Sequence, residues 1–360
     1  MAGRFRVVDT GVREGRFNIA VDQAMVELHQ AGRIPDTFRF MRFPPTALIG
    51  RHQALGQEID VPYCRAHGIG TVRRITGGGA IYLDEGQLGW GLVFHRHTLG
   101  AVSLAELARD ICQTVAVGLT RLGVPARYRP RNDIEVDGRK ISGTGGFFDG
   151  NTLIYQGTVL VDMDPAAMVA ALRVPRAKLE KRQLDSAAQR VVTLRELLGP
   201  KTPGLTAIQQ ALLEAFSERF GVEWNTEVLT AEEETLAWQH YRQEIGTDEF
   251  VAEIDNPASD ADFSVGTHTC AGGTVTTYLR LDGPARNRIG QVLITGDFFV
   301  APPRVVLDLE AALRRIELAE LGSAIERFFR NRTISALTVA PEDFRRSIEL
   351  AAESAAARAQ

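Results

Sequence analysis

Two clusters of glycine stand beside strand-like runs and limit the folds open to this chain. The first is the triplet Gly77–Gly79 in RRITGGGAIY, and the second is Gly143-Thr144-Gly145-Gly146 in KISGTGGFFDG. Consecutive glycines lose much backbone entropy on folding and bury almost no side chain, so they occur where the backbone must turn or approach another group closely. We expect each cluster to be a loop that leaves a strand, either a tight turn or a cradle of N–H groups facing a ligand.

Length and charge describe an ordinary globular chain. Its 360 residues are 44% hydrophobic and carry a net charge of −4, which suits one large domain and one smaller domain. The sequence has neither an apolar run of membrane-spanning length nor a signal-peptide pattern, so we expect a cytoplasmic protein with no membrane partner. The absence of a basic block also argues against nucleic acid as a partner.

Helical and strand periodicities are mixed along the chain, which predicts an α+β fold. The clearest helix is 103–122, where Ser103 and Glu106 form a capping box, and Thr230 with Glu233 marks another helix start. Further helices are expected at 18–30, 165–172, 206–219, 231–243, 308–330 and from 341 onward. Strands are expected at 37–43, 46–50, 70–94 in three pieces, 134–138, 152–162, 273–282 and 288–298.

An acidic segment rich in turn residues suggests a domain boundary. It spans 245–263 and contains GTDEFVAEIDNPASDAD. We therefore predict a catalytic domain at 1–245, a linker and hinge at 246–263, and a smaller α+β accessory domain at 264–360.

The first glycine cluster follows paired arginines, a pattern that suits an anion. Arg73 and Arg74 could supply charge and bidentate hydrogen bonds beside the N–H groups of Gly77–Gly79. Neither standard nucleotide fingerprint is present, because GxxxxGK[ST] is missing and the run after Gly79 is strand-like rather than helical. The residues alone leave open whether this cluster binds phosphate or is a plain turn.

The second cluster follows an amide, a carboxylate and a rare lysine. Asn132 and Asp133 precede Lys140, which is one of only four lysines in the chain. Asp133 could ligate a divalent cation, and Lys140 could neutralise a carboxylate or phosphate oxygen. The alternatives are a turn at Asn132-Asp133 and a solvated hairpin end at Lys140.

Taken together, these blocks resemble one family. RRITGGGAIYLDEGQLGW, RNDIEVDGRKISGTGG and LIYQGTVLVDMD are similar, in this order, to the three signature blocks of lipoate protein ligase A and its acyltransferase relatives. The resemblance continues through RAKLEKRQLDSAAQRVVTL, AGGTVTTYLRLDG and IGQVLITGDF, so it covers nearly the whole chain. It implies the mixed-sheet fold shared by biotin and lipoate ligases and related to class II aminoacyl-tRNA synthetases.

The resemblance also implies a reaction. A lipoate ligase joins lipoate or octanoate to ATP as acyl-AMP, releases pyrophosphate, and delivers the acyl group to a lysine of a carrier. ATP and Mg2+ are the implied cofactors, and a glycine-cleavage H-like protein or a dehydrogenase E2-type lipoyl domain is the implied partner. Lys140 would be catalytic, Asp133 would also hold magnesium, and Lys178 would contact nucleotide or carrier. The other implied acyl-adenylate contacts are Arg73, Arg74, Gly77, Gly78, Gly79, Ala80, Tyr82, Asn132, Asp133, Ser142, Gly143, Thr144 and Gly157.

This chain departs from the family pattern at several positions. Leu83 replaces a common histidine, Gln87 replaces an asparagine, and Tyr155-Gln156 stands where relatives often have a histidine before the glycine. These changes leave acyl and carrier preference open.

The cysteines favour ATP-dependent ligation over ATP-independent acyl transfer. Relatives that move acyl groups between carriers need a thiolate nucleophile. One type carries it in the third block, where this chain has Leu153, and another carries it before the second-block strand, where this chain reads ARYRPRND. The three cysteines present, Cys64, Cys112 and Cys270, are widely spaced and match neither position.

Two alternatives to the ligase hypothesis remain. The chain could bind a lipoyl carrier or transfer acyl groups without ATP, or it could ligate biotin. Biotin ligation is disfavoured because the glycine-loop pattern GRGRxGR of that branch is missing.

Overall fold

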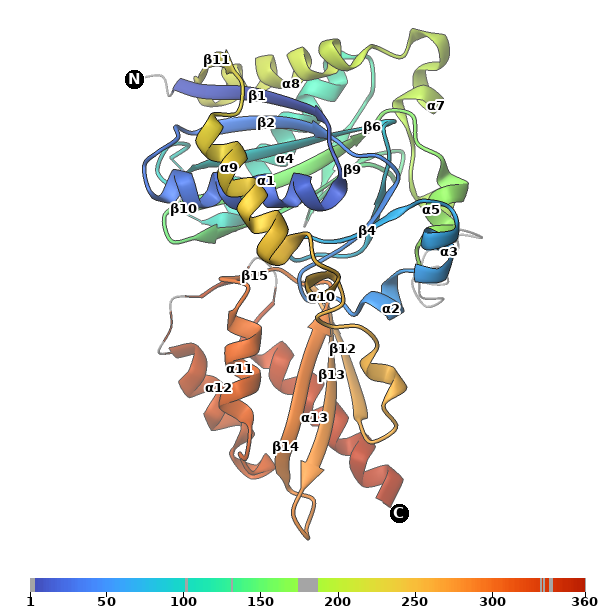
Figure 1. Cartoon of the computed structure of the whole chain (residues 1–360), viewed down its shortest axis with the longest axis vertical. Coiled ribbons are helices and arrows are strands. Elements are labelled where there is room, and N and C mark those ends of the chain that lie inside the picture. The colour runs from blue at the N-terminus through green and yellow to red at the C-terminus, as the bar shows by residue number, and fades with distance from the viewer. Residues whose placement is uncertain are drawn as a thin grey trace.

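The computed structural model describes residues 4–100, 103–130, 132–173, 187–330, 332, 334–336 and 339–359. A large N-terminal unit lies above a smaller C-terminal unit, and the chain crosses between them near helix α10 (Asp248–Val251) (Figure 1). In the described part of the chain, no helix is both long and apolar enough to cross a bilayer.

The large unit is built on an eight-stranded mixed sheet with the order β11-β1-β2-β6-β10-β9-β8-β7. Strands β11 and β2 lie on either side of β1 and run parallel to it, and every pair from β2 through β7 is antiparallel. Its strands are β1 (Arg4–Val12), β2 (Thr37–Arg42), β6 (Gln87–His95), β7 (Arg127–Arg129), β8 (Asp133–Val136), β9 (Arg139–Asp149), β10 (Thr152–Leu160) and β11 (Glu223–Glu227).

Helices cover both faces of this sheet. On one face α4 (Leu104–Arg121) and α8 (Leu205–Phe220) enclose an apolar core with Trp90 and Tyr155. On the other face α1 (Gly15–Gln30) and α9 (Ala231–His240) enclose a second core with Met41 and Phe147. We call these the α4 face and the α1 face.

A second, smaller sheet carries the first glycine cluster. It has the order β4-β3-β5, formed by β3 (Thr46–Ile49), β4 (Gly70–Arg73) and β5 (Ile81–Leu83). Leu48 of β3 and Val72 of β4 belong to the core on the α1 face, so the loop between β4 and β5 lies on that side of the large sheet. Short helices flank it: α2 (Leu55–Glu58), α3 (Val61–Ala66) and α5 (Pro165–Ala171), with α7 (Leu194–Leu198) farther along the chain.

The smaller unit is an antiparallel sheet packed on helices. Its order is β12-β13-β14, from β12 (Ser264–Cys270), β13 (Gly273–Asp282) and β14 (Arg288–Gly296). Helices α11 (Val305–Leu313), α12 (Leu321–Arg330) and α13 (Pro341–Ala359) surround the core, and β15 (Val300–Ala301) pairs with β16 (Ser335–Ala336).

The predicted α+β class, mixed sheet and C-terminal accessory domain are confirmed. The helix at 103–122 and the capping box of Thr230 with Glu233 are also as predicted. The domain boundary at 264 stays a proposal that fits the start of β12 at Ser264.

Two predictions about secondary structure were wrong. The second glycine cluster is not a loop: it lies inside strand β9, paired with β8 and β10. The helix predicted at 308–330 is two helices, because the chain breaks at Arg315, whose φ is +66°, and the Arg315 N–H bonds the carbonyl of Ile289. Strands β1, β7, β11, β12, β15 and β16 were not predicted.

A buried ion pair joins helix α9 to the central sheet. Both side chains, Arg6 on β1 and Glu233 on α9, are buried, and Arg6 donates to both carboxylate oxygens at 2.9 and 2.5 Å. The two hydrogen bonds of this pair offset the cost of desolvating both charges. Removing one partner would leave the other charge buried without them.

We predict that Glu233→Gln lowers the free energy of unfolding by about 3 kcal/mol, because buried Arg6 loses its bidentate counter-charge and keeps only Glu227, at 3.9 Å. The matched control is Glu232→Gln on the same helix, whose partner Arg33 is exposed, and its effect should stay below about 1 kcal/mol. Urea denaturation of the three proteins measures both values. Equal effects of the two substitutions would contradict the account.

Candidate functional site

The first glycine cluster is shaped by Arg74. Its guanidinium donates to the carbonyl of Gly77 at 2.7 and 3.0 Å and to that of Gly79 at 2.9 Å. Gly78 between them has φ +96°, a backbone conformation that side chains disfavour, so glycine is needed there. Burial lowers the pKa of Arg74 to about 10, which leaves it cationic at neutral pH. Nη1 is buried and has no hydrogen-bond partner among the described residues.

The structure gives Arg73 a supporting role. Its guanidinium is fully buried and donates to main-chain carbonyls of two separate segments. These are Gly50, Arg51 and Gln53 near β3, and Phe250, Val251 and Ile254 near α10. Arg73 therefore fixes the protein backbone around the glycine cluster, and Arg74 is the arginine with donor capacity left.

Lys140, Asp133 and Gly143 meet at the start of β9. Lys140 Nζ lies 3.0 Å from Asp133 Oδ1, and Arg129 donates to the other oxygen of the same carboxylate. Burial alone would raise the pKa of Asp133, but the charges of Lys140 and Arg129 outweigh it and hold the pKa below its usual value. A Cβ at Gly143 would lie 2.3 Å from Lys140 Nζ, so the ammonium rests on bare backbone.

This arrangement does not make Asp133 a ready magnesium ligand. Both of its oxygens already face cations, and the described residues contain no cluster of three or more His, Cys, Asp or Glu side chains that could hold a metal. The predicted Mg2+ site does not fit these donors, and we derive no step through a protein-bound metal.

Asn132 is held by Thr144 at the open end of the β8–β9 hairpin. Asn132 Nδ2 donates to the Thr144 carbonyl at 2.7 Å, and the Thr144 N–H returns a 2.8 Å bond to the Asn132 carbonyl. Thr144 Oγ1 also lies 2.8 Å from the Tyr155 hydroxyl and 3.2 Å from Cys112 Sγ. Asn132 is thus positioned through a buried cluster on the α4 face.

Successive residues of β9 point to opposite faces, and this alternation divides the predicted site residues. The Thr144 side chain points to the α4 face, so Gly143 and Gly145 present bare backbone on the α1 face, where Lys140 Nζ lies. Gly78 of the first cluster faces the same place: the ring of Phe299 packs on both Gly78 and Gly145. The structure therefore brings together Arg74, Gly77–Gly79, Gly143, Gly145 and Lys140.

Other predicted residues are buried or pack elsewhere. Gly157 leaves room for the Trp90 ring, which a Cβ would meet at 2.4 Å, and it faces the α4 core. Tyr82 is buried beside Cys64, with its pKa raised to about 12 by burial and by nearby Asp84. Ser142 Oγ is buried without a partner in the described part of the chain.

Two further predicted residues have separate outcomes. Ala80 stands just before β5 and packs against the same small core as Tyr82. Lys178 lies outside the described residues.

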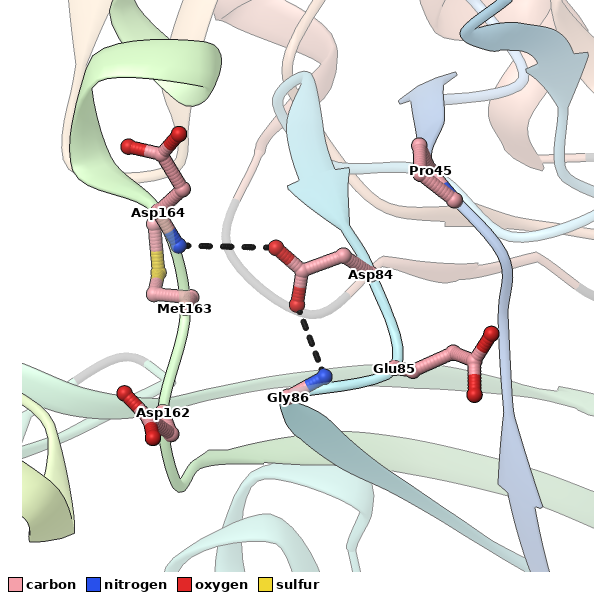
Figure 2. Close-up of a pocket in the computed structure, with 7 residues that line it drawn as sticks. All are labelled: Pro45, Asp84, Glu85, Gly86, Asp162, Met163 and Asp164. Atoms are coloured by element: carbon pink, nitrogen blue, oxygen red, sulfur yellow. Dashed lines mark hydrogen bonds between the residues drawn. The ribbon is translucent and has the colours of Figure 1, made fainter.

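An open cavity of about 510 Å3 lies at the turn that follows β5, and it differs from this centre in charge. Its lining includes Asp84, Glu85, Asp162 and Asp164 (Figure 2). The Asp84 carboxylate accepts from the N–H groups of Gly86 and Asp164, at 2.9 and 3.5 Å, so it shapes the turn itself. Burial raises its pKa. An acidic cavity repels carboxylates and phosphates, so the candidate site is the glycine-lined surface instead.

Sequence reasoning missed the contribution of Phe298, Phe299 and His52. The first two follow ITGD in the accessory domain, and His52 stacks on Phe298 with ring centres 5.1 Å apart. Burial, with the charges of Arg51 and Arg73, lowers the pKa of His52 to about 3, so the ring is neutral at physiological pH. The signal available was Phe298 at the end of IGQVLITGDF, a block that the resemblance already covered, with Phe299 directly after it.

The family model for the lipoyl protein ligase A/B catalytic domain matches residues 14–217, more than half of the chain. The chain belongs to this family. The match covers both glycine clusters and Lys140, and it ends within α8.

Relatives of this lipoyl ligase family member include both ligases and transferases. Octanoyltransferase LipM of Kyrpidia tusciae is 31% identical over 259 residues, covering 65% of this chain and 94% of that protein. A bi-partite lipoate protein ligase from Thermoplasma acidophilum, studied with its E2 lipoyl domain, has TM-score 0.61 and 26% identity, over 71% of this chain and 97% of that one. A lipoate-protein ligase A bound with ATP has the same TM-score and identity, over 71% of this chain and 100% of that one.

The buried neutral His52 predicts a loss of stability in acid. The unfolded chain binds a proton on this ring near pH 6.5, whereas the folded protein does so only near pH 3, so its contribution is present above pH 6.5 and lost as the pH falls. His52→Phe keeps the stack on Phe298 and removes the titration. Between pH 7.5 and pH 5 the variant should lose about 2 kcal/mol less unfolding free energy than the wild type. Parallel pH profiles from urea denaturation would contradict this.

Proposed function

We propose that this protein is an ATP-dependent lipoate–protein ligase, which activates lipoate or octanoate as acyl-AMP and transfers the acyl group to a carrier lysine. The observation that carries the proposal is the pairing of Lys140 with bare glycine backbone on the α1 face, in a site that contains no cysteine. The relatives support lipoyl or octanoyl transfer in general, and this pairing favours the ATP-dependent route.

The positions of the three cysteines argue against a thioester route. Cys112 is fully buried and contacts Thr144 and Tyr155 on the α4 face, opposite to Lys140. Cys64 is fully buried under the small sheet, and burial raises its pKa to about 11, which disfavours a thiolate. Cys270 lies on β12 of the accessory domain, and burial raises its pKa too.

In the first step the acid carboxylate attacks the α-phosphorus of ATP, and pyrophosphate leaves with the electrons of the broken P–O bond. Two anions must approach, so cationic groups lower the barrier. Arg74 and Lys140 are those groups in this site: Arg74 holds the glycine loop open as a surface for the nucleotide, and the ammonium of Lys140 faces the reacting oxygens. Gly78, Gly143 and Gly145 let the adenylate approach the backbone.

In the second step the neutral amine of the carrier lysine attacks the acyl carbonyl, and AMP leaves after the tetrahedral oxyanion collapses. The attacking nitrogen loses its proton to solvent to give the amide. Lys140 can stabilise the oxyanion because its ammonium already lies where the acyl phosphate would be held. The proposed carrier is a lipoyl domain, of E2 type or like the glycine-cleavage H protein.

The second candidate is octanoyl transfer from one carrier to another without ATP. The 31% identity with an octanoyltransferase favours it, although this chain has no cysteine beside Lys140. To separate the two, an unmodified lipoyl domain is offered either free octanoate with ATP or an octanoylated acyl carrier protein without ATP. We expect modified lipoyl domain only in the first mixture. Product only in the second would replace ligase with transferase.

Lys140→Ala should reduce ATP-dependent modification of the lipoyl domain at least about 100-fold, because the site loses its main cation at the reacting centre. Arg129 still pairs with Asp133 in the variant, so the fold should persist. Lys201→Ala is the matched control, since Lys201 is an exposed lysine beside α7. Mass spectrometry of the carrier gives the rates, and undiminished modification by Lys140→Ala would refute the assignment.

A further inference from the structure

The accessory domain reaches into the candidate site through the segment that follows β14. The N–H of Gly78 donates to the carbonyl of Phe298 at 3.2 Å, and the N–H of Gly296 donates to the carbonyl of His52 at 3.0 Å. These bonds cross from one unit to the other in both directions. The stacked rings of His52 and Phe298 also pack across this interface.

Phe299 fills the space between the two glycine clusters. A Cβ built on Gly78 would lie 2.6 Å from the Phe299 ring, and one built on Gly145 would lie 2.3 Å from it. A Cβ on Gly77 would lie 2.1 Å from the Phe298 carbonyl oxygen. The Phe299 ring is therefore in contact with bare backbone on both sides and is only 7% exposed.

Two groups with the same position exclude each other. The glycine surface beside Lys140 is where the proposed reaction needs the acyl-adenylate, and the Phe299 ring already covers Gly78 and Gly145 there. Two groups cannot pack against the same backbone atoms at the same time. An adenylate can therefore lie on these glycines only after the Phe299 ring has moved away.

We propose that Phe299 is an internal competitor of the acyl-adenylate: with this side chain the accessory domain covers the activation site, and the adenylate occupies the site only after Phe299 has moved away. This inference rests on the proposed function and deepens it by assigning the accessory domain a regulatory residue in the site. We call the state in which Phe299 has left the glycine surface the open state. Acyl-adenylate forms only in this state.

The proposal has two quantitative consequences. A ligand that binds only the open state shows a dissociation constant raised by the inverse of the open fraction, so weakening the docked state tightens binding. By linkage, the same ligand must loosen the contact between the accessory segment and the glycine loop. The first consequence is tested by substitution and the second on the wild-type protein.

The probe is 5′-O-[N-(octanoyl)sulfamoyl]adenosine, a stable analogue of octanoyl-AMP, titrated by calorimetry into the full chain. Phe299→Ala should bind it at least ten-fold more tightly than the wild type. The matched control is Phe329→Ala, because Phe329 also belongs to the accessory domain but packs on Phe344, with ring centres 5.7 Å apart. Its affinity should equal that of the wild type.

The outcomes separate this inference from the proposed function. Equal or weaker binding by Phe299→Ala, with measurable binding by the wild type, overturns the competitor role alone. Binding by none of the three proteins contradicts the adenylating function and the inference together. A gain shared by Phe299→Ala and Phe329→Ala overturns the inference, since general loosening of the accessory domain would explain it.

Hydrogen exchange on the wild type provides a test that does not depend on a variant. The amides of Gly78 and Gly296 are held by bonds between the two units, so their peptides are protected while Phe299 is docked. Saturating analogue should speed exchange in the peptide that contains 296–299. Unchanged or slower exchange there would overturn the proposal.

Discussion

The site depends on a single buried guanidinium. Arg73 ends β4 and binds carbonyls of the segment at 50–53 and of the segment at 250–254. A buried charge without such acceptors would be strongly unfavourable. The carbonyls therefore stabilise the buried guanidinium, and the guanidinium in turn fixes the position of both segments. The contact fixes the start of the glycine loop and the chain that leads into the accessory domain. It therefore links the geometry of the site to the place from which Phe299 approaches.

The two faces of the central sheet differ in role at the second glycine cluster: one packs in a core and the other presents bare backbone. On the α4 face, Thr144, Tyr155 and Cys112 form a buried polar cluster inside an apolar core, and this cluster positions Asn132. On the α1 face, the same strand offers Gly143 and Gly145 and leaves its backbone open to another group. One strand can therefore anchor a core and present a binding surface, because its side chains alternate.

The sequence was sufficient to predict the elements that local signals define. The capping boxes at Ser103 and Thr230 set helix starts, and the apolar repeat of α4 set its buried side. The second glycine cluster was predicted as a loop because glycine disfavours strands, yet β9 tolerates it: Thr144 and Phe148 pack on the α4 face, and on the other face the Phe299 ring takes the place of a side chain at Gly145. Local preference was overridden by pairing with β8 and β10.

For the site, too, the sequence was insufficient wherever tertiary contacts decide the role of a residue. Lys140 and the paired arginines stand out in the sequence by rarity and spacing, but only the tertiary contacts separate Arg73 from Arg74 in role. Phe299 lies far from both glycine clusters in sequence, so no local pattern connects it with them. Gly157 matches a family position, but its neighbour is Trp90 in the α4 core.

The measurement that tests the central claim most directly is exchange of labelled pyrophosphate into ATP, with lipoate or octanoate present and no carrier. Reversible formation of acyl-AMP at Arg74, Lys140 and the glycine surface predicts exchange that needs one of these acids, with biotin inactive in a parallel reaction. Absence of exchange with either acid, in a protein that still modifies a lipoyl domain from an acylated carrier, would contradict the claim that this site activates a free acid.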